Sequence, residues 1–108
     1  MDQPQKLEQS SQELQSIFEG LLESGNVYYN PPASVRMEYD AIVFRRSRIN
    51  NRFANNGVYL QSHSYEVTVI TTDPDAPIID KISKLPRCSF DRSFVSDNLY
   101  HNVFTLYH

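Results

Sequence analysis

An arginine cluster is the feature of this sequence whose chemistry most clearly requires a binding partner. Its four arginines are Arg45, Arg46, Arg48 and Arg52. Two aromatic residues, Phe53 and Tyr59, lie in the same segment, residues 45–63. Guanidinium groups interleaved with aromatic rings contact phosphates and stack on single-stranded bases, but they also pair with carboxylates on an acidic protein surface. A solvated charged loop is the plainer interpretation. The net charge of −3 favours a protein partner over nucleic acid.

The histidines and the cysteine form no catalytic or metal-binding pattern. His63, His101 and His108 lack the i, i+4 spacing of a helical metal site, and we expect strand or terminal positions for them. Cys88 follows Arg87, but no histidine is placed by sequence to act as its base, so we expect a small buried hydrophobic residue. Three glycines form no phosphate loop. We therefore expect no enzyme activity, no metal and no cofactor.

The acidic residues near position 75 have two interpretations. Asp73, Asp75 and Asp80 could form a cation site, but the calcium-loop pattern is absent. Acidic residues also suit the first turn of a helix. We expect Asp73 to cap a helix that has Pro74 in its first turn, and Asp80 to pair with Lys84 at i, i+4.

A strand and a helix on either side of this cap are the elements that organise the chain. Residues 64–71 alternate as a half-buried strand, with Tyr65, Val67 and Val69 on one face. Residues 78–85 carry an apolar helical stripe, and Pro86 then ends the helix. Neither element buries its apolar face alone, so other strands must supply the rest of the core.

Length and composition indicate one soluble domain spanning residues 1–108. The sequence has 40% hydrophobic and 21% charged residues, one cysteine, and no apolar run long enough to span a membrane. An internal disulfide is excluded. The N-terminus lacks the pattern of a signal peptide, so we expect the protein to remain in the cytoplasm of the cell that makes it, until lysis.

The first 46 residues predict a helix and two strands. An apolar stripe predicts a helix over residues 6–24, with Gly25 as a left-handed cap and fraying near Ser10 and Ser11. A short strand follows at 27–29. Residues 39–46 form the next strand, whose apolar centre predicts burial on both faces.

Residues 45–63 predict a long, protruding basic hairpin or loop, since Asn-Asn-Gly favours a turn. Beyond the second helix, 88–94 and 99–107 are strands joined by a turn at 96–98. The last strand places Tyr100, Phe104 and Leu106 on one face and Leu99, Val103 and Tyr107 on the other. Because both faces are apolar, we expect this strand to be central in the sheet or to lie at a subunit interface.

These elements predict an α+β fold in the order α-β-β-β-α-β-β. Its mixed, mainly antiparallel sheet carries both helices on one face.

Several runs in this order resemble the tail terminator, or tail completion, proteins of long-tailed, siphovirus-like bacteriophages. The resemblance covers the chain from about residue 28 to its end, and the N-terminal helix agrees in kind. The runs are Tyr28-Tyr29-Asn30-Pro31-Pro32, Met37-Glu38-Tyr39-Asp40-Ala41-Ile42-Val43-Phe44, Tyr65-Glu66-Val67-Thr68-Val69-Ile70, Asp73-Pro74-Asp75, Leu85-Pro86, Cys88-Ser89-Phe90-Asp91-Arg92, Asp97-Asn98-Leu99 and Val103-Phe104-Thr105-Leu106-Tyr107.

The resemblance implies a structural virion protein in the tail end or neck. Such proteins form a ring, usually hexameric, that caps the tail tube, ends its polymerisation and docks onto the head connector. Tail tube and connector proteins are then the partners, and DNA passes through the lumen. The residue 45–63 segment would meet an axial partner or line the lumen, and Leu99, Val103 and Tyr107 would meet the neighbouring subunit.

Two other functions remain open on the sequence. One is a head-completion or connector adaptor of the same neck. The other is a nucleic-acid-binding module that uses the arginines of residues 45–52.

Overall fold

The computed structural model describes the backbone of residues 3–53 and 59–108, and the side chains of residues 9–47 and 63–108. Its elements are α1 (Gln3–Leu22), β1 (Val27–Tyr29), β2 (Ala41–Phe53), β3 (Tyr59–Thr71), α2 (Pro77–Ser83), β4 (Cys88–Ser96) and β5 (Leu99–Tyr107). The predicted order α-β-β-β-α-β-β is confirmed, as is the α+β class.

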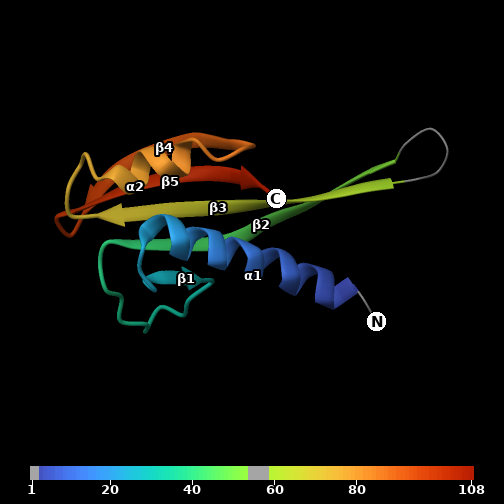
Figure 1. Cartoon of the computed structure of the whole chain (residues 1–108), viewed down its shortest axis with the longest axis horizontal. Coiled ribbons are helices and arrows are strands. Elements are labelled where there is room, and N and C mark those ends of the chain that lie inside the picture. Colours follow the sequence, from blue (N-terminus) through green and yellow to red (C-terminus); the bar gives the residue numbers. More distant parts are fainter. Residues whose placement is uncertain (1–2, 54–58) are drawn as a thin grey trace.

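The described strands form one mixed sheet in the order β1-β2-β3-β5-β4. β1 runs parallel to β2, and every other pairing is antiparallel. Figure 1 shows α1 crossing the sheet near β1 and β2, while α2 lies over β4 and β5. The core is therefore a single layer of side chains between one face of the sheet and the two helices.

The core forms where the helices meet the alternate residues of the central strands. Phe44 of β2 is fully buried and packs edge-on against Phe18 of α1, with ring centroids 5.1 Å apart. Ile82 of α2 and Phe104 of β5 belong to the same buried cluster. The predicted burial of residues 41–44 on both faces is confirmed, because all four side chains are buried.

The predicted end of α1 is wrong by two residues. The helix ends at Leu22, and the left-handed residue that follows is Glu23, with φ of 59°, rather than Gly25. The N–H groups of Glu23 and Ser24 both donate to the carbonyl of Glu19. These bonds satisfy an otherwise unpaired carbonyl in the last turn, which outweighs the modest cost of positive φ at a non-glycine residue.

The expected fraying of α1 near Ser10 and Ser11 is not observed. Both serines are buried, and Ser10 Oγ lies 2.8 Å from the hydroxyl of Tyr65 on β3. The helix is held here by a polar contact with the sheet, which an apolar-stripe analysis does not detect.

The helix-start prediction at Asp73 and Pro74 is also wrong. A proline does occupy the first turn of the helix, but three residues later. α2 begins at Pro77, with Ala76 as an N-cap that makes no side-chain capping bond. Asp73 instead accepts a hydrogen bond from the backbone N–H of Asp75, at 2.9 Å, and shapes the preceding turn. The prediction chose Pro74, but Pro77 is equally suited to a first helical turn and is the one that begins α2.

The β2–β3 pair continues well past the predicted strand end at residue 46. Both strands are 13 residues long and pair from Ala41 with Ile70 out to Phe53 with Tyr59. Of the two forms expected for residues 45–63, the structure therefore has a hairpin, with a register shift between Arg46 and Arg48. Figure 1 shows this hairpin projecting beyond the rest of the sheet.

The last strand is interior, and its two faces are those predicted. β5 lies between β3 and β4; Phe104 faces the helices opposite Val67, and Val103 lies on the other face opposite Thr68. The turn before it is confirmed, with positive φ at Asp97 and Asn98, as a tight two-residue hairpin turn requires.

Candidate functional site

The base of the hairpin holds two of the six residues predicted as its contact set. Arg45 is exposed and pairs with Glu66 in the backbone register, whereas Arg46 is half-buried with its guanidinium 5.6 Å from the ring centroid of Tyr65. Successive strand residues face opposite sides of a sheet. The two arginines therefore do not form one surface.

The other four predicted contact residues have side chains outside the described part of the chain. Their backbone positions are in the two strands: Arg48 pairs with Ser64, Arg52 with Leu60, and Phe53 with Tyr59. The partners of Arg45, Arg48 and Arg52 on β3 are all even-numbered, so these three backbone positions belong to one face of the ladder. The spacing in sequence could not show this, because the register shift after Arg46 changes the alternation.

A polar cluster lies under α1 where the hairpin leaves the core. It joins Tyr65, Ser10 and Arg46 to His63, whose ring lies edge-on to that of Tyr65 with centroids 6.5 Å apart. The last residue of the chain contacts this cluster. The backbone N–H of His108 donates to the carbonyl of His63, at 2.9 Å, and Nε2 of His108 lies 3.0 Å from a carboxylate oxygen of Glu13.

His63 is the buried titratable group of this cluster. Its side chain is 8% exposed, and Nε2 has no hydrogen-bond partner among the described residues. Burial lowers the pKa of His63, and the nearby charge of Arg46 and the imidazole of His108 lower it further. A neutral imidazole is thus favoured.

The other candidate groups are placed apart from one another. His101 stacks on Phe94 with centroids 4.7 Å apart, at the opposite end of the strands from His63. Asp80 forms an ion pair with Lys84 at 2.8 Å, as predicted, and this contact raises the pKa of Lys84. No three His, Cys, Asp or Glu side chains within residues 9–47 and 63–108 are grouped so that they could hold a metal ion.

Cys88 is half-buried at the start of β4. Burial raises the pKa of its thiol, which opposes the thiolate form that a nucleophile requires. Its position agrees with the predicted packing role, although it is not fully covered.

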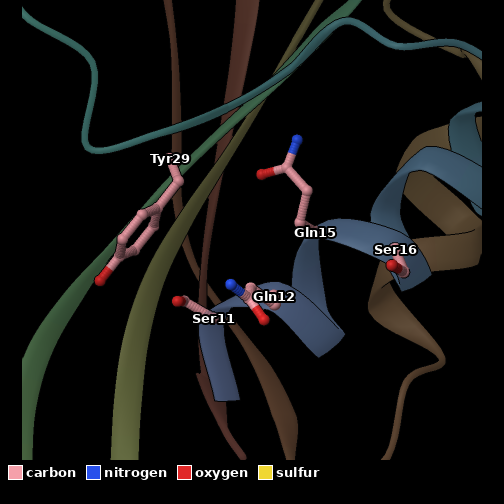
Figure 2. A pocket seen from close by; sticks show the side chains of 5 residues that line it. All are labelled: Ser11, Gln12, Gln15, Ser16 and Tyr29. Carbon is pink, nitrogen blue, oxygen red and sulfur yellow. The ribbon is translucent and has the colours of Figure 1, made fainter. Parts of the chain in front are cut away.

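A polar pocket of about 280 Å³ lies between α1 and β1. Figure 2 shows its lining: Ser11, Gln12, Gln15 and Ser16 from α1, with Tyr29 across from them. Gln15 is already held, because its amide donates to Glu19 and to the carbonyl of Val27. The lining has hydroxyl and amide groups but no acid, base or cation, so its chemistry is limited to weak hydrogen bonding.

An apolar groove of about 250 Å³ lies on the other side of α1. Its lining comes from α1, from the segment after α2 and from the end of the chain: Leu14, Ile17, Leu85, Pro86, Arg87, Leu106, Tyr107 and His108. We call it the C-terminal groove.

The edge of the sheet formed by β4 is a surface that the sequence did not predict. Every β4 residue after Cys88 is exposed, and Phe90, Phe94 and Val95 present 58%, 44% and 62% of their surfaces. An edge strand also leaves a row of backbone N–H and C=O groups unpaired on its outer side. The alternation in residues 88–94 predicted the strand correctly, but alternation does not show on which side a sheet ends.

The predicted subunit contact on the last strand is contradicted at Val103, and it stays a prediction at Leu99 and Tyr107. Val103 is 1% exposed, so it is covered within the chain and is not available to a neighbour. Leu99 is half-buried, and Tyr107 is 40% exposed beside the C-terminal groove. The free edge on this side of the sheet belongs to β4, because β4 lies outside β5.

No family model, curated protein or solved structure matches this chain. Among the described residues, no helix has both the length and the apolarity needed to cross a membrane.

Proposed function

We propose that this protein is the ring-forming tail terminator of a long-tailed bacteriophage. In this role it caps the tail tube, ends polymerisation of the tube subunits and joins the tail to the head. It acts in the virion as a homo-oligomer, a hexameric ring as its resemblance to that family implies, and it is assembled in the host cytoplasm.

The observation that carries the proposal is the ordered set of sequence runs from Tyr28 to Tyr107, which resembles that family. The fold is compatible with the role. A ring subunit needs one surface for its neighbours in the ring and another for partners along the ring axis, and this chain has an exposed strand edge and a projecting hairpin.

The hairpin suits an axial or luminal contact. It extends from the core as a two-stranded ribbon, so it can reach a partner without disturbing the core. Three of its four arginines occupy backbone positions on one face. In one orientation they meet acidic groups of the tube or connector, and in the other they meet DNA phosphates in the lumen.

The decisive experiment asks whether the protein is in the virion and whether it limits the tail. Purified particles should contain the protein at the junction of head and tail, visible by cryo-electron microscopy. Loss of its gene should give headless tails of abnormal length. Its absence from particles, or tails of normal length that attach normally without it, would refute the proposal.

The arrangement of the arginines also supports a second candidate, a nucleic-acid-binding module. Replacement of Arg45, Arg48 and Arg52 by alanine should then weaken DNA binding and flatten its dependence on salt concentration. Arg46→Ala is the matched control, because Arg46 lies on the opposite face. Binding that is weak and unchanged in the triple variant removes this candidate.

The third candidate is a head-completion or connector adaptor of the same neck. The same micrographs separate it from the terminator, because an adaptor contacts the portal while a terminator contacts the last ring of tube subunits. Tails that stop at normal length without the protein, yet fail to join heads, would favour the adaptor.

A further inference from the structure

We propose that one copy of this chain contacts the next through Val95 at one end of the sheet, which enters the C-terminal groove at the other end of its neighbour. The proposal rests on the proposed function in one respect, since it names the contact by which the ring would form.

The first half of the contact is the exposed apolar side chain of Val95. Val95 is 62% exposed at the end of β4, beside the turn that carries Asp97. It pairs with Tyr100, so it is on the face of the sheet that carries the helices. An exposed aliphatic side chain on an unpaired edge strand is a typical site of association.

The second half is the C-terminal groove, which has the size and polarity for such a side chain. Its volume of about 250 Å³ exceeds the roughly 150 Å³ of an apolar cavity that accommodates benzene. Leu14 and Leu106 form its buried floor, and Ile17 is 38% exposed at its rim. The groove lies on the same helix-bearing side of the sheet as Val95.

Charge supports this pairing over other occupants of the groove. The guanidinium of Arg87 lies at the rim, 5.9 Å from the ring centroid of Tyr107. Asp97 is exposed two residues from Val95. A neighbour that inserts Val95 therefore brings a carboxylate towards Arg87, and the pair of unlike charges fixes its orientation.

The two halves cannot meet within one copy. Val95 lies at the level of Tyr100, whereas the groove lies at the level of Leu106 and Tyr107, six to seven residues along β5. At 3.3 Å per residue this separation is roughly 20 Å. A copy that gives Val95 to one neighbour and its groove to another makes a head-to-tail contact, which generates a ring or an open chain, whereas reciprocal exchange between only two copies would give a two-fold dimer.

Disulfide trapping between two single-cysteine variants tests the contact directly. Both are made in the Cys88→Ser chain, one with Val95→Cys and the other with Ile17→Cys. Mixed at high concentration under mild oxidation, they should form a covalent heterodimer, while neither variant alone should form a homodimer at a comparable rate. Gln12→Cys, exposed on another side of the same helix, replaces Ile17→Cys as the matched control and should not cross-link above background.

Asp97→Asn provides a second measurement. Asparagine tolerates the positive φ of this turn position, so the fold is kept while the charge is removed. Cross-linking should become about two- to fivefold slower, the loss expected for one exposed ion pair, and less sensitive to salt.

The possible results separate the contact from the function. Heterodimer yields no greater than those of the Gln12→Cys control overturn the contact, even if the protein is found in virions. Efficient homodimers of the Val95→Cys variant would also overturn it, because they indicate pairing of two β4 edges. A specific heterodimer supports the contact, and it does so even if the protein is absent from virions and the terminator proposal fails.

Discussion

Individual buried polar side chains decide how the N-terminal half of α1 is attached to the sheet. Its apolar stripe meets the core through Leu14 and Phe18, but one turn earlier the helix is joined to the sheet by Ser10 and Tyr65. His63 lies beside that pair. Buried polar groups contribute stability only while they remain hydrogen-bonded and uncharged, so each of these residues makes the fold sensitive to a specific change.

The pH dependence of stability should follow His63. Its folded-state pKa is lowered from the ordinary value of 6.5, so the unfolded chain binds the proton more readily. The stabilising contribution of the neutral ring is complete above about pH 6.5 and is lost as the pH falls below that value. Urea unfolding between pH 5 and pH 8 should show this decline.

His63→Gln should reduce that decline, since glutamine does not titrate. His101→Gln is the control and should keep it, because His101 lies at the other end of the strands. A decline of equal size in wild type and in His63→Gln would assign the effect to another group.

The hydroxyl contact between Ser10 and Tyr65 should be measurable by a double-mutant cycle. Tyr65→Phe leaves the buried Ser10 hydroxyl without this partner, and should lower the free energy of unfolding by about 1–3 kcal/mol. Ser10→Ala should lower it by a similar amount. The double variant should cost less than the sum of the two, and strict additivity would show that the contact contributes nothing.

At the scale of elements, the two helices and the hairpin have different roles. α2 is only seven residues long, and its stability depends on tertiary packing rather than on helix propensity. The hairpin is the reverse case: its outer part extends from the sheet, beyond the strand segments that the helices cover. We therefore expect α2 to be sensitive to single core substitutions, and the outer hairpin to tolerate large changes.

Ile82→Ala should strongly destabilise the fold. Ile82 is fully buried in the main core cluster, so removing its side chain leaves a cavity and should cost about 2–5 kcal/mol. Ile79→Ala is the matched control in the same helix; Ile79 is only partly buried, so a smaller loss is expected. Denaturant midpoints at constant m-value provide the measurement. Equal losses in the two variants would contradict this packing of α2.

The hairpin should be removable without loss of the fold. Replacing residues 50–62 by Asn-Gly joins Ile49 to His63, which already pair, through a two-residue turn of the favoured type. Shortening the connection changes chain entropy little, so the free energy of unfolding should change by about 1 kcal/mol or less.

The shortened chain should nevertheless fail to restore normal tails when it replaces the full-length protein in an infection. Full rescue of tail length and head attachment would show that the hairpin is dispensable for the proposed function. An unfolded variant would instead show that the outer hairpin supports the core, contrary to the packing described above.

At the scale of the whole molecule, the surface has two distinctive features, the exposed edge strand β4 and the projecting hairpin. The molecule measures 51 × 26 × 23 Å, and the hairpin accounts for its elongation (Figure 1). Both helices cover the same face of the sheet, and β4 at the edge is left with little cover. A chain of this shape has distinct surfaces for lateral and axial contacts, which is the physical basis of both proposals.

The sequence by itself determined the number, type and order of the elements. Period-two alternation identified β3 and both faces of β5, and a helical stripe identified α1 and α2. These signals are local, because the side-chain period of a segment depends on its own backbone geometry. The same analysis placed apolar residues 41–44 in the core, and it identified the turn at Asp97 and Asn98 from residue types that tolerate positive φ.

Only the tertiary structure decided which strands lie side by side, and hence which surfaces are free. The two apolar faces of residues 99–107 favoured a central strand, but only the sheet order shows that β4 is the edge, with Val95 exposed, while Val103 of β5 is covered. Likewise, the register shift after Arg46 brings the backbone positions of Arg45, Arg48 and Arg52 to one face of the hairpin, which strict alternation along the sequence does not predict. Exposure depends on long-range pairing and on the packing of the helices, which the residue types of a single segment do not fix by themselves.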